Sequence, residues 1–372
     1  MEILILGGTG AMGAPLVKSL STYPLKHSVT VTSRSYHNNT SSVTYVKGNA
    51  RDNEFLHGLL SEKHYDVIID FMNYDLDEFR NRVNILLEST QRYIWFSSCR
   101  VYAESDSPLT ESHPRLLENS ADKKFLSTNR YALRKARQED ILLKSDYSNY
   151  VIIRPYITYN DERLQLGICE KEQWLNRILK NKPLVLSSAM LDRVTTLTYG
   201  NDVSKAIVAL MSLPNVDGEI FQVAGNDTIT WRQLLSLYME ILRNKEDISP
   251  IIYCSNSIKC IEMLYEGGYN TIYDRNYNRL FDSSKLDKVI GSKLEYTGIR
   301  DGITRCLSNF LSGERKFRHI DPIYEAYQDI LTDTYSIRED FDNDEDFNIY
   351  QRYRVSIPTE LKFAKSNLIR II

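Results

Sequence analysis

The chain has 372 residues, of which 42% are hydrophobic and 26% are charged, and its formal net charge is −3. This composition is typical of a folded soluble protein, and it excludes a largely disordered chain, a collagen and a coiled coil. The small negative charge does not fit the basic footprint of a nucleic-acid-binding protein, so no nucleic-acid partner is expected.

Cysteine and histidine usage excludes two further classes of site. The five cysteines contain no Cys-x-x-Cys pair, and the six histidines lack the spacing of a zinc motif. An odd number of cysteines fits a reducing compartment, so we expect neither a disulfide framework nor a metal site. No apolar stretch approaches the roughly 18 residues of a membrane-spanning helix, and no basic signal segment precedes the first apolar run. We therefore expect a cytoplasmic protein without membrane contact.

Short apolar runs alternate with helix-like stretches along the chain. Runs of this kind suit strands buried on both faces of a parallel sheet, and their alternation with helices indicates a doubly wound α/β fold. The expected strands are Ile3–Leu6, Val29–Thr32, Val43–Val46, Val67–Phe71, Tyr93–Phe96, Val151–Ile153 and Glu219–Val223. The clearest helical stretches are Pro15–Leu20, Glu54–Leu60 and Glu78–Leu87.

The regular alternation lapses twice, and the lapses predict a smaller, discontinuous substrate-binding lobe. We expect a Rossmann-type domain from residues 1–155 plus about 195–225. The lobe would consist of about 156–194 plus 226–314.

Residues 315–372 form a C-terminal extension without an assigned role. Its acidic run, Glu339–Asp346, is interpreted as a solvated loop or linker, because a calcium loop would need a glycine that is missing here. Residues 347–372 regain apolar character and could cover either the lobe or a partner subunit.

Glycine is scarce, yet four of the 16 glycines fall within the first thirteen residues. Gly7, Gly10 and Gly13 follow an expected strand and precede an expected helix. In that context the first glycine allows a tight turn, the second lets the backbone approach a pyrophosphate, and the third lets the helix pack closely on the strand. The pattern predicts dinucleotide binding, and it leaves Gly8 without a specific role.

The second strand indicates which dinucleotide is bound. An NAD site usually ends this strand with an acid that holds the ribose diol. Here no Asp or Glu occurs between Glu2 and Asp52, and Ser33-Arg34-Ser35 follows the strand instead. Because an arginine at this place can pair with a 2′-phosphate, NADP is favoured and NAD stays possible. The alternative is that Arg34 is a solvated loop residue.

Tyr131 and Lys135 form a Tyr-x-x-x-Lys pair, which shares one face of a helix. The fifth strand ends in Ser97-Ser98, at the sheet edge where parallel α/β proteins bind ligands. A free tyrosine ionises near pH 10, so proton transfer near neutral pH requires a cation in a pocket of low dielectric. Lys135 and an oxidised nicotinamide would supply that charge. Tyr131 would be the general acid or base, and Ser98 would hydrogen-bond the same substrate oxygen.

With these motifs the chain resembles the extended short-chain dehydrogenase/reductases, especially the nucleotide-sugar epimerases and reductases of the NAD-dependent epimerase/dehydratase family. The resemblance covers about residues 1–312. It rests on GGTGAMG at Gly7–Gly13, GNARD at Gly48–Asp52, FSSCRVY at Phe96–Tyr102, YALRK at Tyr131–Lys135, RPYITY at Arg154–Tyr159, NDVSKAI at Asn201–Ile207 and FDSSKLDKVIG at Phe281–Gly291.

The resemblance implies that Ser98, Tyr131 and Lys135 are catalytic, that Pro155 lies against the nicotinamide, and that Asp52 and its neighbours lie by the adenine. It also implies a homodimer. The residues expected to contact the cofactor are Gly7, Thr9, Gly10, Ala11, Met12, Gly13, Ser33, Arg34, Asn49, Ala50, Asp70, Phe71, Met72, Ser97, Tyr131, Lys135 and Pro155.

Departures from the family pattern reduce the number of reactions that the chain could catalyse. Cys99-Arg100 follow Ser98 where the sugar 4,6-dehydratases of the family have an Asp-Glu pair. Arginine stays protonated and cannot replace that pair, so dehydration is disfavoured. Cys99 is interpreted as a small buried residue. Asn49, Ala103 and Asn160 replace residues common in the family, which affects loop details and not the chemistry.

The substrate end is less specific. Arg193 and Arg279 resemble, in approximate position, the phosphate-binding arginines of the family, and each could equally be a solvated charge. Arg100 could bind a substrate anion such as a carboxylate, and Tyr156 could stack on a base or a sugar.

The sequence thus predicts an oxidoreductase that acts on a nucleotide-activated sugar. An NADPH-dependent ketoreductase of surface-polysaccharide or deoxysugar biosynthesis is the first expectation. An epimerase with tightly bound NAD⁺ needs the same three residues and remains the close alternative. A non-catalytic NADP-binding regulator or RNA-binding relative is the alternative of another class.

Overall fold

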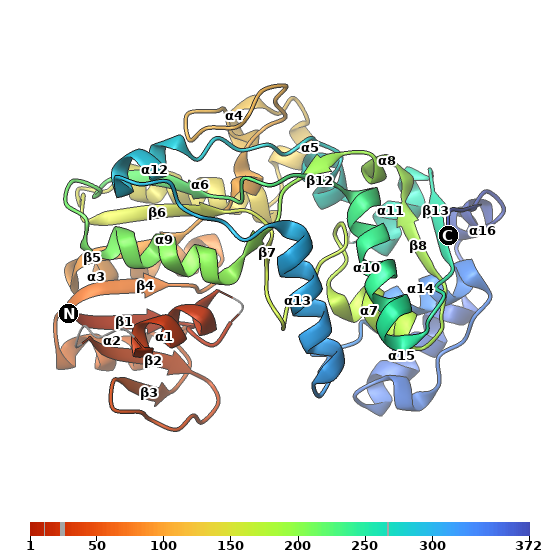
Figure 1. Cartoon of the computed structure of the whole chain (residues 1–372), viewed down its shortest axis with the longest axis horizontal. Coiled ribbons are helices and arrows are strands. Elements are labelled where there is room, and N and C mark those ends of the chain that lie inside the picture. Colours follow the sequence, from red (N-terminus) through yellow and green to blue (C-terminus); the bar gives the residue numbers. More distant parts are fainter. Residues whose placement is uncertain (11, 23–26, 266–267) are drawn as a thin grey trace.

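A parallel sheet forms the centre of the molecule. The computed structural model describes residues 1–10, 12–22, 27–265 and 268–372. Seven strands pair in parallel in the order β11-β6-β5-β4-β1-β2-β3 (Figure 1). They are β1 (Glu2–Leu6), β2 (Ser28–Ser33), β3 (Val43–Lys47), β4 (Tyr65–Asp70), β5 (Thr90–Phe96), β6 (Tyr150–Pro155) and β11 (Glu219–Val223). This order is that of the doubly wound Rossmann sheet with one further strand at its edge.

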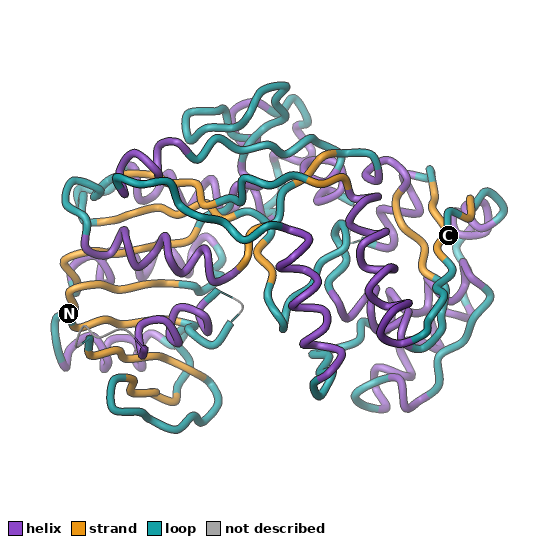
Figure 2. The backbone as a smooth tube through the Cα atoms, in the orientation of Figure 1, coloured by secondary structure: helices purple, strands orange, loops and turns teal. Residues whose placement is uncertain are grey.

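Helices cover both faces of the sheet (Figure 2). One face is covered by α1 (Gly13–Thr22), α9 (Gly200–Ser212) and α12 (Ser284–Ile290). The opposite face is covered by α2 (Asn53–Glu62), α3 (Leu76–Glu88) and α6 (Tyr131–Leu143). Since successive strand side chains point to opposite faces, β1 buries Ile3 and Ile5 in one core and Leu4 and Leu6 in the other.

These observations confirm the predicted fold class, since the ends of each of the seven expected strands lie within three residues of those of an observed strand. The helix starts also have local causes. Asp52 caps α2 by accepting a hydrogen bond from the Phe55 amide, and Asp75 forms a capping box with Glu78 at α3.

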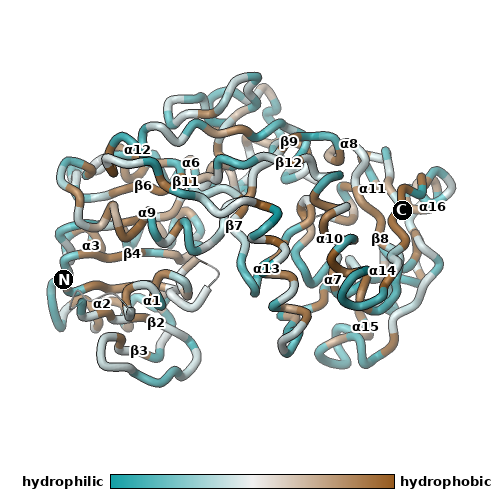
Figure 3. The backbone as a smooth tube through the Cα atoms, viewed as in Figure 1, coloured by the Kyte–Doolittle hydropathy of each residue, from teal (hydrophilic) through white to brown (hydrophobic). Residues whose placement is uncertain are grey.

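A second core lies beside the sheet (Figure 1). A three-stranded sheet of order β14-β13-β8 contributes to it, and β8 is among its most hydrophobic segments (Figure 3). The elements of this region are β7 (Thr158–Tyr159), α7 (Lys171–Leu179), β8 (Leu184–Ser187), α8 (Ser188–Leu191), β9 (Val194–Thr195), β10 (Thr198–Tyr199), β12 (Ile229–Thr230), α10 (Trp231–Glu246), β13 (Ile252–Ser255), α11 (Ile258–Leu264), η2 (Thr271–Arg275) and α13 (Ile299–Ser312). Between β5 and α6 lie η1 (Cys99–Val101), α4 (Leu116–Asn119) and α5 (Lys123–Leu126).

The C-terminal extension packs against this second core. It consists of α14 (Pro322–Thr332), η3 (Arg338–Asp340), α15 (Asp344–Val355), α16 (Thr359–Lys365) and β14 (Ile369–Arg370). Tyr324, Leu331 and Leu361 are buried in the core, and β14 pairs antiparallel with β13. Within residues 347–372, Leu361 and Ala364 belong to this second core.

A buried ion-pair network joins α14 of the extension to α7. The guanidinium of Arg177 on α7 is fully buried and contacts Glu325 at 2.5 Å and Asp329 at 2.9 Å, both on α14. Removing one partner of such a pair would leave an uncompensated buried charge, so α7 and α14 depend on one another.

The interpretation of the acidic run as a loop or linker is wrong in its second half. Asp344–Asp346 form the first turn of α15, where Asn343 accepts a hydrogen bond from the Asp346 amide at 2.9 Å. Acids in the first turn favour a helix because they face the positive end of its dipole. Within the described ranges, no helix is long and apolar enough to cross a membrane.

Candidate functional site

The glycine-rich loop lies between β1 and α1 and has the geometry of a dinucleotide cradle. Gly7 has a φ of +72°, in the left-handed region that favours glycine. A Cβ on Gly10 would have open space around it, with its nearest neighbour the Gly7 carbonyl at 3.9 Å. A Cβ on Gly13 would come within 2.7 Å of the Gly8 backbone, so its absence lets α1 approach the loop. Backbone exposed at a helix N-terminus fits a pyrophosphate.

Gly8 also has a defined role, which the spacing of the motif did not indicate. A Cβ there would lie 2.8 Å from a Val31 methyl group and 2.9 Å from an Ile5 methyl group. Gly8 is therefore required where the loop packs against side chains of β1 and β2. Thr9 is exposed, and Ala11 lies outside the described residues.

The end of β2 lies beside this loop. The Gly7 amide donates a hydrogen bond of 3.2 Å to the Thr32 hydroxyl, and Arg34 follows two residues later with an exposed side chain. The Ser33 hydroxyl is within 3.0 Å of His37 Nε2. At the end of β3, Asn49 is exposed and Ala50 is buried, while the Asp52 carboxylate caps α2.

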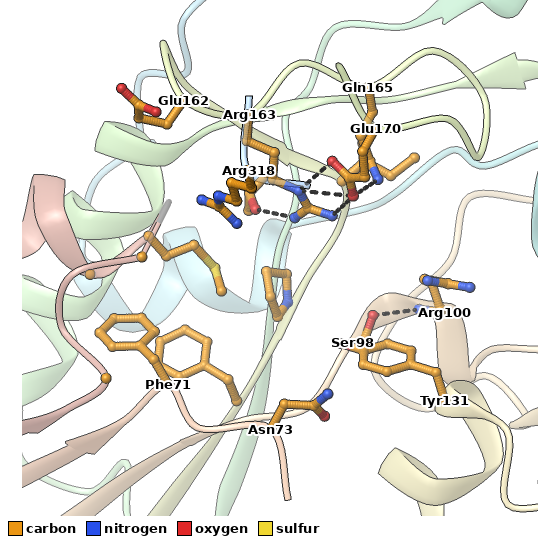
Figure 4. A pocket seen from close by; sticks show the side chains of 18 of the residues that line it. Phe71, Asn73, Ser98, Arg100, Tyr131, Glu162, Arg163, Gln165, Glu170 and Arg318 are labelled. Carbon is orange, nitrogen blue, oxygen red and sulfur yellow. Dashed lines mark hydrogen bonds and ion pairs between the residues drawn. The ribbon is translucent and has the colours of Figure 1, made fainter. Parts of the chain in front are cut away.

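A pocket of about 720 Å³ extends from the glycine loop across the ends of the strands. This volume is sufficient for a ligand of cofactor or substrate size. Figure 4 shows its lining, with Ser98, Tyr131 and Arg100 on one side and Phe71 on the other. The predicted site residues that line it are Gly7, Gly10, Met12, Gly13, Phe71, Met72, Ser97, Ser98, Arg100, Tyr131, Lys135 and Pro155.

Ser98 and Tyr131 come from two different elements. Ser98 follows β5 and caps η1, where its Oγ accepts a hydrogen bond from the Arg100 amide at 3.2 Å. Because a hydroxyl can accept and donate at once, its proton stays available for a ligand oxygen. Tyr131 is the first residue of α6, and the Arg100 guanidinium lies over its ring, with Cζ 4.9 Å from the centroid.

Lys135 lies one helical turn after Tyr131 and is 3% exposed. Its Nζ donates a hydrogen bond of 2.7 Å to the Phe96 carbonyl and lies 4.5 Å from the Trp95 ring centroid. Burial lowers the pKa of Lys135 to about 7, although the nearby Asp70 partly opposes this shift. The amine is thus held in the low-dielectric surroundings that the proposed chemistry requires.

Asp70 itself is fully buried beneath the pocket. Its carboxylate accepts hydrogen bonds from the Tyr93 hydroxyl at 2.7 Å, the Tyr74 hydroxyl at 3.3 Å and the Met72 amide at 2.9 Å. Burial raises the pKa of this carboxyl group. Asp70 therefore fixes the start of the loop after β4 through its hydrogen bond with the Met72 amide.

Three of the four candidate substrate residues lie away from the pocket lining. Arg193 is exposed on the chain between α8 and β9. Arg279 is fully buried and donates to the carbonyls of Ala103 at 3.1 Å and Tyr102 at 3.0 Å. Tyr156 is buried against Phe281, with ring centroids 4.9 Å apart. Only Arg100 reaches the pocket.

The remaining lining residues were not found from the sequence. They lie at or just after the ends of β4 and β5, in the chain between residues 157 and 173, in the η2 turn and at the start of the extension. They are Asn73, Phe96, Ile157, Thr158, Glu162, Arg163, Gln165, Glu170, Glu172, Gln173, Arg275, Arg318, His319 and Asp321. No local motif marks them, since tertiary packing brings these segments together.

Cys99 is a small buried residue, as the sequence predicts. Cys99 is fully buried and donates its thiol to the Arg154 carbonyl at 3.0 Å, and burial raises the pKa of the thiol. Among the described residues, His319, Asp342 and Asp346 offer ligand atoms within 4.8 Å of one another. All three carry partly or fully exposed side chains, as acidic surface groups commonly do.

Two curated relatives match the chain at low identity. The first is the chloroplast stem-loop binding protein of 41 kDa b of Arabidopsis thaliana, 24% identical over 246 residues, which are 62% of this chain and 60% of that protein. The second is subunit 9 of the NADH dehydrogenase [ubiquinone] 1 alpha subcomplex of Dictyostelium discoideum, 19% identical over 52% of this chain and 49% of that protein. The chain thus spans about half to three fifths of these relatives.

Solved structures share the fold at lower identity still. A dTDP-glucose 4,6-dehydratase from Bacillus anthracis in complex with NAD has a TM-score of 0.63 and 17% identity, covering 85% of this chain and 98% of that one. A UDP-glucuronic acid 4-epimerase from Bacillus cereus, in complex with UDP-glucuronic acid and NAD, has a TM-score of 0.61 and 15% identity, covering 84% and 99%. The family model "NAD dependent epimerase/dehydratase family" matches residues 3–224. With its glycine cradle, its Tyr131–Lys135 helix and this match, the chain belongs to the NAD dependent epimerase/dehydratase family.

Proposed function

We propose that this protein is an NADPH-dependent ketoreductase that acts on a nucleotide-activated sugar, in the biosynthesis of a surface polysaccharide or a deoxysugar. The observation that carries the proposal is that Ser98, Tyr131 and Lys135 line the same pocket as Gly7 and Gly10. Two hydroxyl groups and a buried amine beside a dinucleotide cradle are what proton delivery to a carbonyl oxygen needs. Membership of the family supports the same chemistry.

The bound dinucleotide would supply the hydride, and residues of the chain would handle the proton. Tyr131 would give its phenolic proton to the carbonyl oxygen, and Ser98 would hydrogen-bond that oxygen with the proton that its contact to Arg100 leaves available. Lys135 uses one donor on the Phe96 carbonyl. Its other N–H groups would be available to the ribose of the cofactor.

The preference for NADPH rests on Arg34. Its side chain is exposed at the end of β2, and no Asp or Glu occurs between Glu2 and Asp52 to bind an unphosphorylated ribose. A guanidinium suits a 2′-phosphate because it offers several donors in one plane.

Activity on a set of nucleotide-linked keto sugars, followed through the oxidation of NADPH, tests the proposal. We expect the Tyr131→Phe variant to lose about 100-fold or more in kcat, since the acid is removed, while NADPH binding persists. Tyr335→Phe is the matched control, because Tyr335 is exposed on the extension. Equal activity of Tyr131→Phe and the wild type would contradict the assignment.

An epimerase that keeps its cofactor would use the same three residues, and the solved relatives in complex with NAD favour it as the second candidate. The nucleotide released when the purified protein is denatured separates the two. Stoichiometric NAD⁺ supports the epimerase and excludes the NADPH-reductase version. Protein free of nucleotide that binds NADPH supports the reductase.

Stem-loop RNA binding is a third candidate, and it is favoured by the name of the first curated relative. Retention of Ser98, Tyr131 and Lys135 in one pocket supports an enzyme instead. A gel-shift assay with a stem-loop RNA at physiological salt tests this candidate. Specific retardation, together with unchanged NADPH oxidation in Tyr131→Phe, would favour the RNA-binding function.

A further inference from the structure

A single buried carboxylate, that of Asp274 on η2, is surrounded by three guanidinium groups. Arg275 is in ion-pair contact with it, Arg279 Nε lies 3.0 Å from its Oδ1, and Arg100 Nε lies 3.6 Å from its Oδ2. Asp274 is 2% exposed, and the only other group that reaches it within the described ranges is the Tyr156 hydroxyl at 3.4 Å. One negative charge thus faces three positive charges.

The three arginines differ in how well they are satisfied. Arg279 donates to the carbonyls of Tyr102 and Ala103 in addition to Asp274, so main-chain oxygens complete its surroundings. Arg100 and Arg275, by contrast, line the pocket. Arg100 Nε and Arg275 Nη1 both face Asp274 Oδ2, and the two guanidinium groups otherwise donate to the Asn270 amide oxygen and to the Gly167 carbonyl, respectively.

The carboxylate of Glu170, which also lines the pocket, does not make up the difference. Glu170 is hydrogen-bonded to Arg163, with Nη2 and Oε1 2.8 Å apart, and also accepts from Gln165. Burying more positive than negative charge is costly, and burial lowers the pKa of Arg275 to about 9. Arg275 is 2% exposed, so water does not compensate its charge. The pocket wall beside Tyr131 therefore holds an excess of buried positive charge.

Two cationic places lie along the pocket. Arg163 and Arg318 lie together on one side, and Arg100 lies on the other side beside Ser98 and Tyr131 (Figure 4). In a nucleotide sugar the diphosphate lies between the sugar and the nucleoside. With the sugar at Ser98 and Tyr131, the diphosphate fits the Arg163–Arg318 side. Arg100 and Arg275 are then left to bind an acidic group on the sugar itself.

We propose that the sugar of the substrate carries a carboxylate next to the carbon that exchanges hydride, and that Arg100 and Arg275 bind this carboxylate. The inference rests on the proposed function and specifies its substrate class, an acidic nucleotide sugar. The carboxylate would offset the positive charge of Arg100 and Arg275 that Asp274 alone does not balance, and it would orient the ring toward Tyr131.

Binding of matched nucleotide sugars to the purified full-length protein in the presence of NADPH tests this inference. The probes are UDP-glucuronic acid against UDP-glucose, and GDP-mannuronic acid against GDP-mannose, because each pair differs only in the carboxylate. We expect the acidic member of at least one pair to bind the wild type about tenfold or more tightly than its neutral partner, as charge-assisted hydrogen bonds imply.

Two variants of the site and one control complete the experiment. Arg100→Gln and Arg275→Gln are expected to reduce the preference for the acidic sugar to about one, with little change in the affinity for the neutral sugar. Arg300→Gln is the matched control, since Arg300 is exposed on α13 and contacts Glu240. NADPH binding by each variant reports whether it is folded. If Arg275→Gln does not fold, Arg100→Gln carries the test.

The outcomes distinguish the two proposals. Equal binding of acidic and neutral sugars by the wild type, or a preference that survives in both variants, overturns the carboxylate site and leaves the proposed function intact. A protein that binds NADPH and none of the four sugars overturns the proposed function, and the carboxylate site with it.

Discussion

The amine of Lys135 donates a hydrogen bond of 2.7 Å to the main-chain carbonyl of Phe96, directly under the pocket. This contact joins α6, which begins with Tyr131, to the end of β5, which Ser98 follows two residues later. The lysine is 3% exposed, and burial lowers its pKa to about 7. One residue thus fixes the spacing of the site and keeps a titratable amine there.

The lowered pKa of Lys135 predicts a pH-dependent stability. Between about pH 7 and the ordinary lysine pKa of 10.5, the unfolded chain binds a proton that the folded chain has released. The free energy of unfolding therefore rises with pH across this window, and the full cost of burying the amine is present below it. We expect a gain on the order of 2 kcal/mol from about pH 7 to pH 9, measured by denaturant unfolding of the cofactor-free protein.

Lys135→Met is the comparison for this prediction. The variant keeps the shape of the side chain without the amine, so the part of the rise that belongs to Lys135 should disappear while other titrating groups behave as before. A Lys135→Met protein with the same pH dependence as the wild type would show that the amine is not held out of water.

The glycine loop offers a pair of substitutions with opposite consequences. Gly13→Ala should destabilise the protein by about 1–3 kcal/mol, because the new methyl group would overlap the Gly8 backbone. Gly10→Ala should change the stability by less than about 0.5 kcal/mol, because its Cβ would meet nothing nearer than 3.9 Å. That methyl group would instead occupy the space of the pyrophosphate and weaken NADPH binding about tenfold or more.

Thermal unfolding and NADPH titration of the two variants check this pair. A Gly10→Ala protein that binds NADPH as the wild type does would remove the loop from the cofactor site, whatever the behaviour of Gly13→Ala.

We expect Arg34 to favour the binding of NADPH over NADH. Removing the guanidinium in Arg34→Ala should weaken NADPH binding about tenfold, as loss of a charge-assisted contact to a 2′-phosphate would, and leave NADH binding nearly unchanged. The ratio of the two dissociation constants is the measurement. Arg300→Ala serves as the control for loss of an exposed arginine. An unaltered ratio in Arg34→Ala would make Arg34 a solvated loop residue.

The sequence predicts the strands of the sheet, but it identifies only part of the residues that line the pocket. Each strand of the sheet is encoded locally, by a short apolar run and its bounding turn, so Ile3–Leu6 or Glu219–Val223 could be recognised alone. Gly7 and Ser98 could be placed because they come after the first and the fifth strand, at the edge of the sheet where ligands bind. Tyr131 could be placed because its helix comes after the fifth strand.

The other half of the pocket depends on tertiary packing. Arg163, Arg275 and Arg318 lie up to 155 residues apart in sequence, and no spacing relates them. The sequence instead suggested Arg279, whose guanidinium is buried against main-chain carbonyls. The sequence shows the charge of Arg279, but it does not show which carbonyl groups accept hydrogen bonds from the guanidinium.

The start of the C-terminal extension is held against α7 and brings Arg318 to the pocket. Lys171 on α7 is buried, donates to the Lys316 carbonyl at 2.6 Å and lies 5.2 Å from the Phe317 ring centroid. These contacts hold the chain where Arg318 lines the pocket. Within the described ranges no carboxylate pairs with the Arg318 guanidinium, so it is available to a ligand phosphate.

We therefore expect Arg318→Ala to raise the KM for the nucleotide sugar several-fold while kcat and thermal stability stay near those of the wild type, since an exposed arginine on a phosphate contributes to binding and not to the chemistry. Arg315→Ala is the matched control, because Arg315 lies on the same segment and pairs with Glu246 at 2.7 Å. Lys171→Met should produce the KM effect of Arg318→Ala by releasing the segment, with a loss of stability in addition. Equal KM values for Arg318→Ala and Arg315→Ala would show that the extension covers the lobe without serving the pocket.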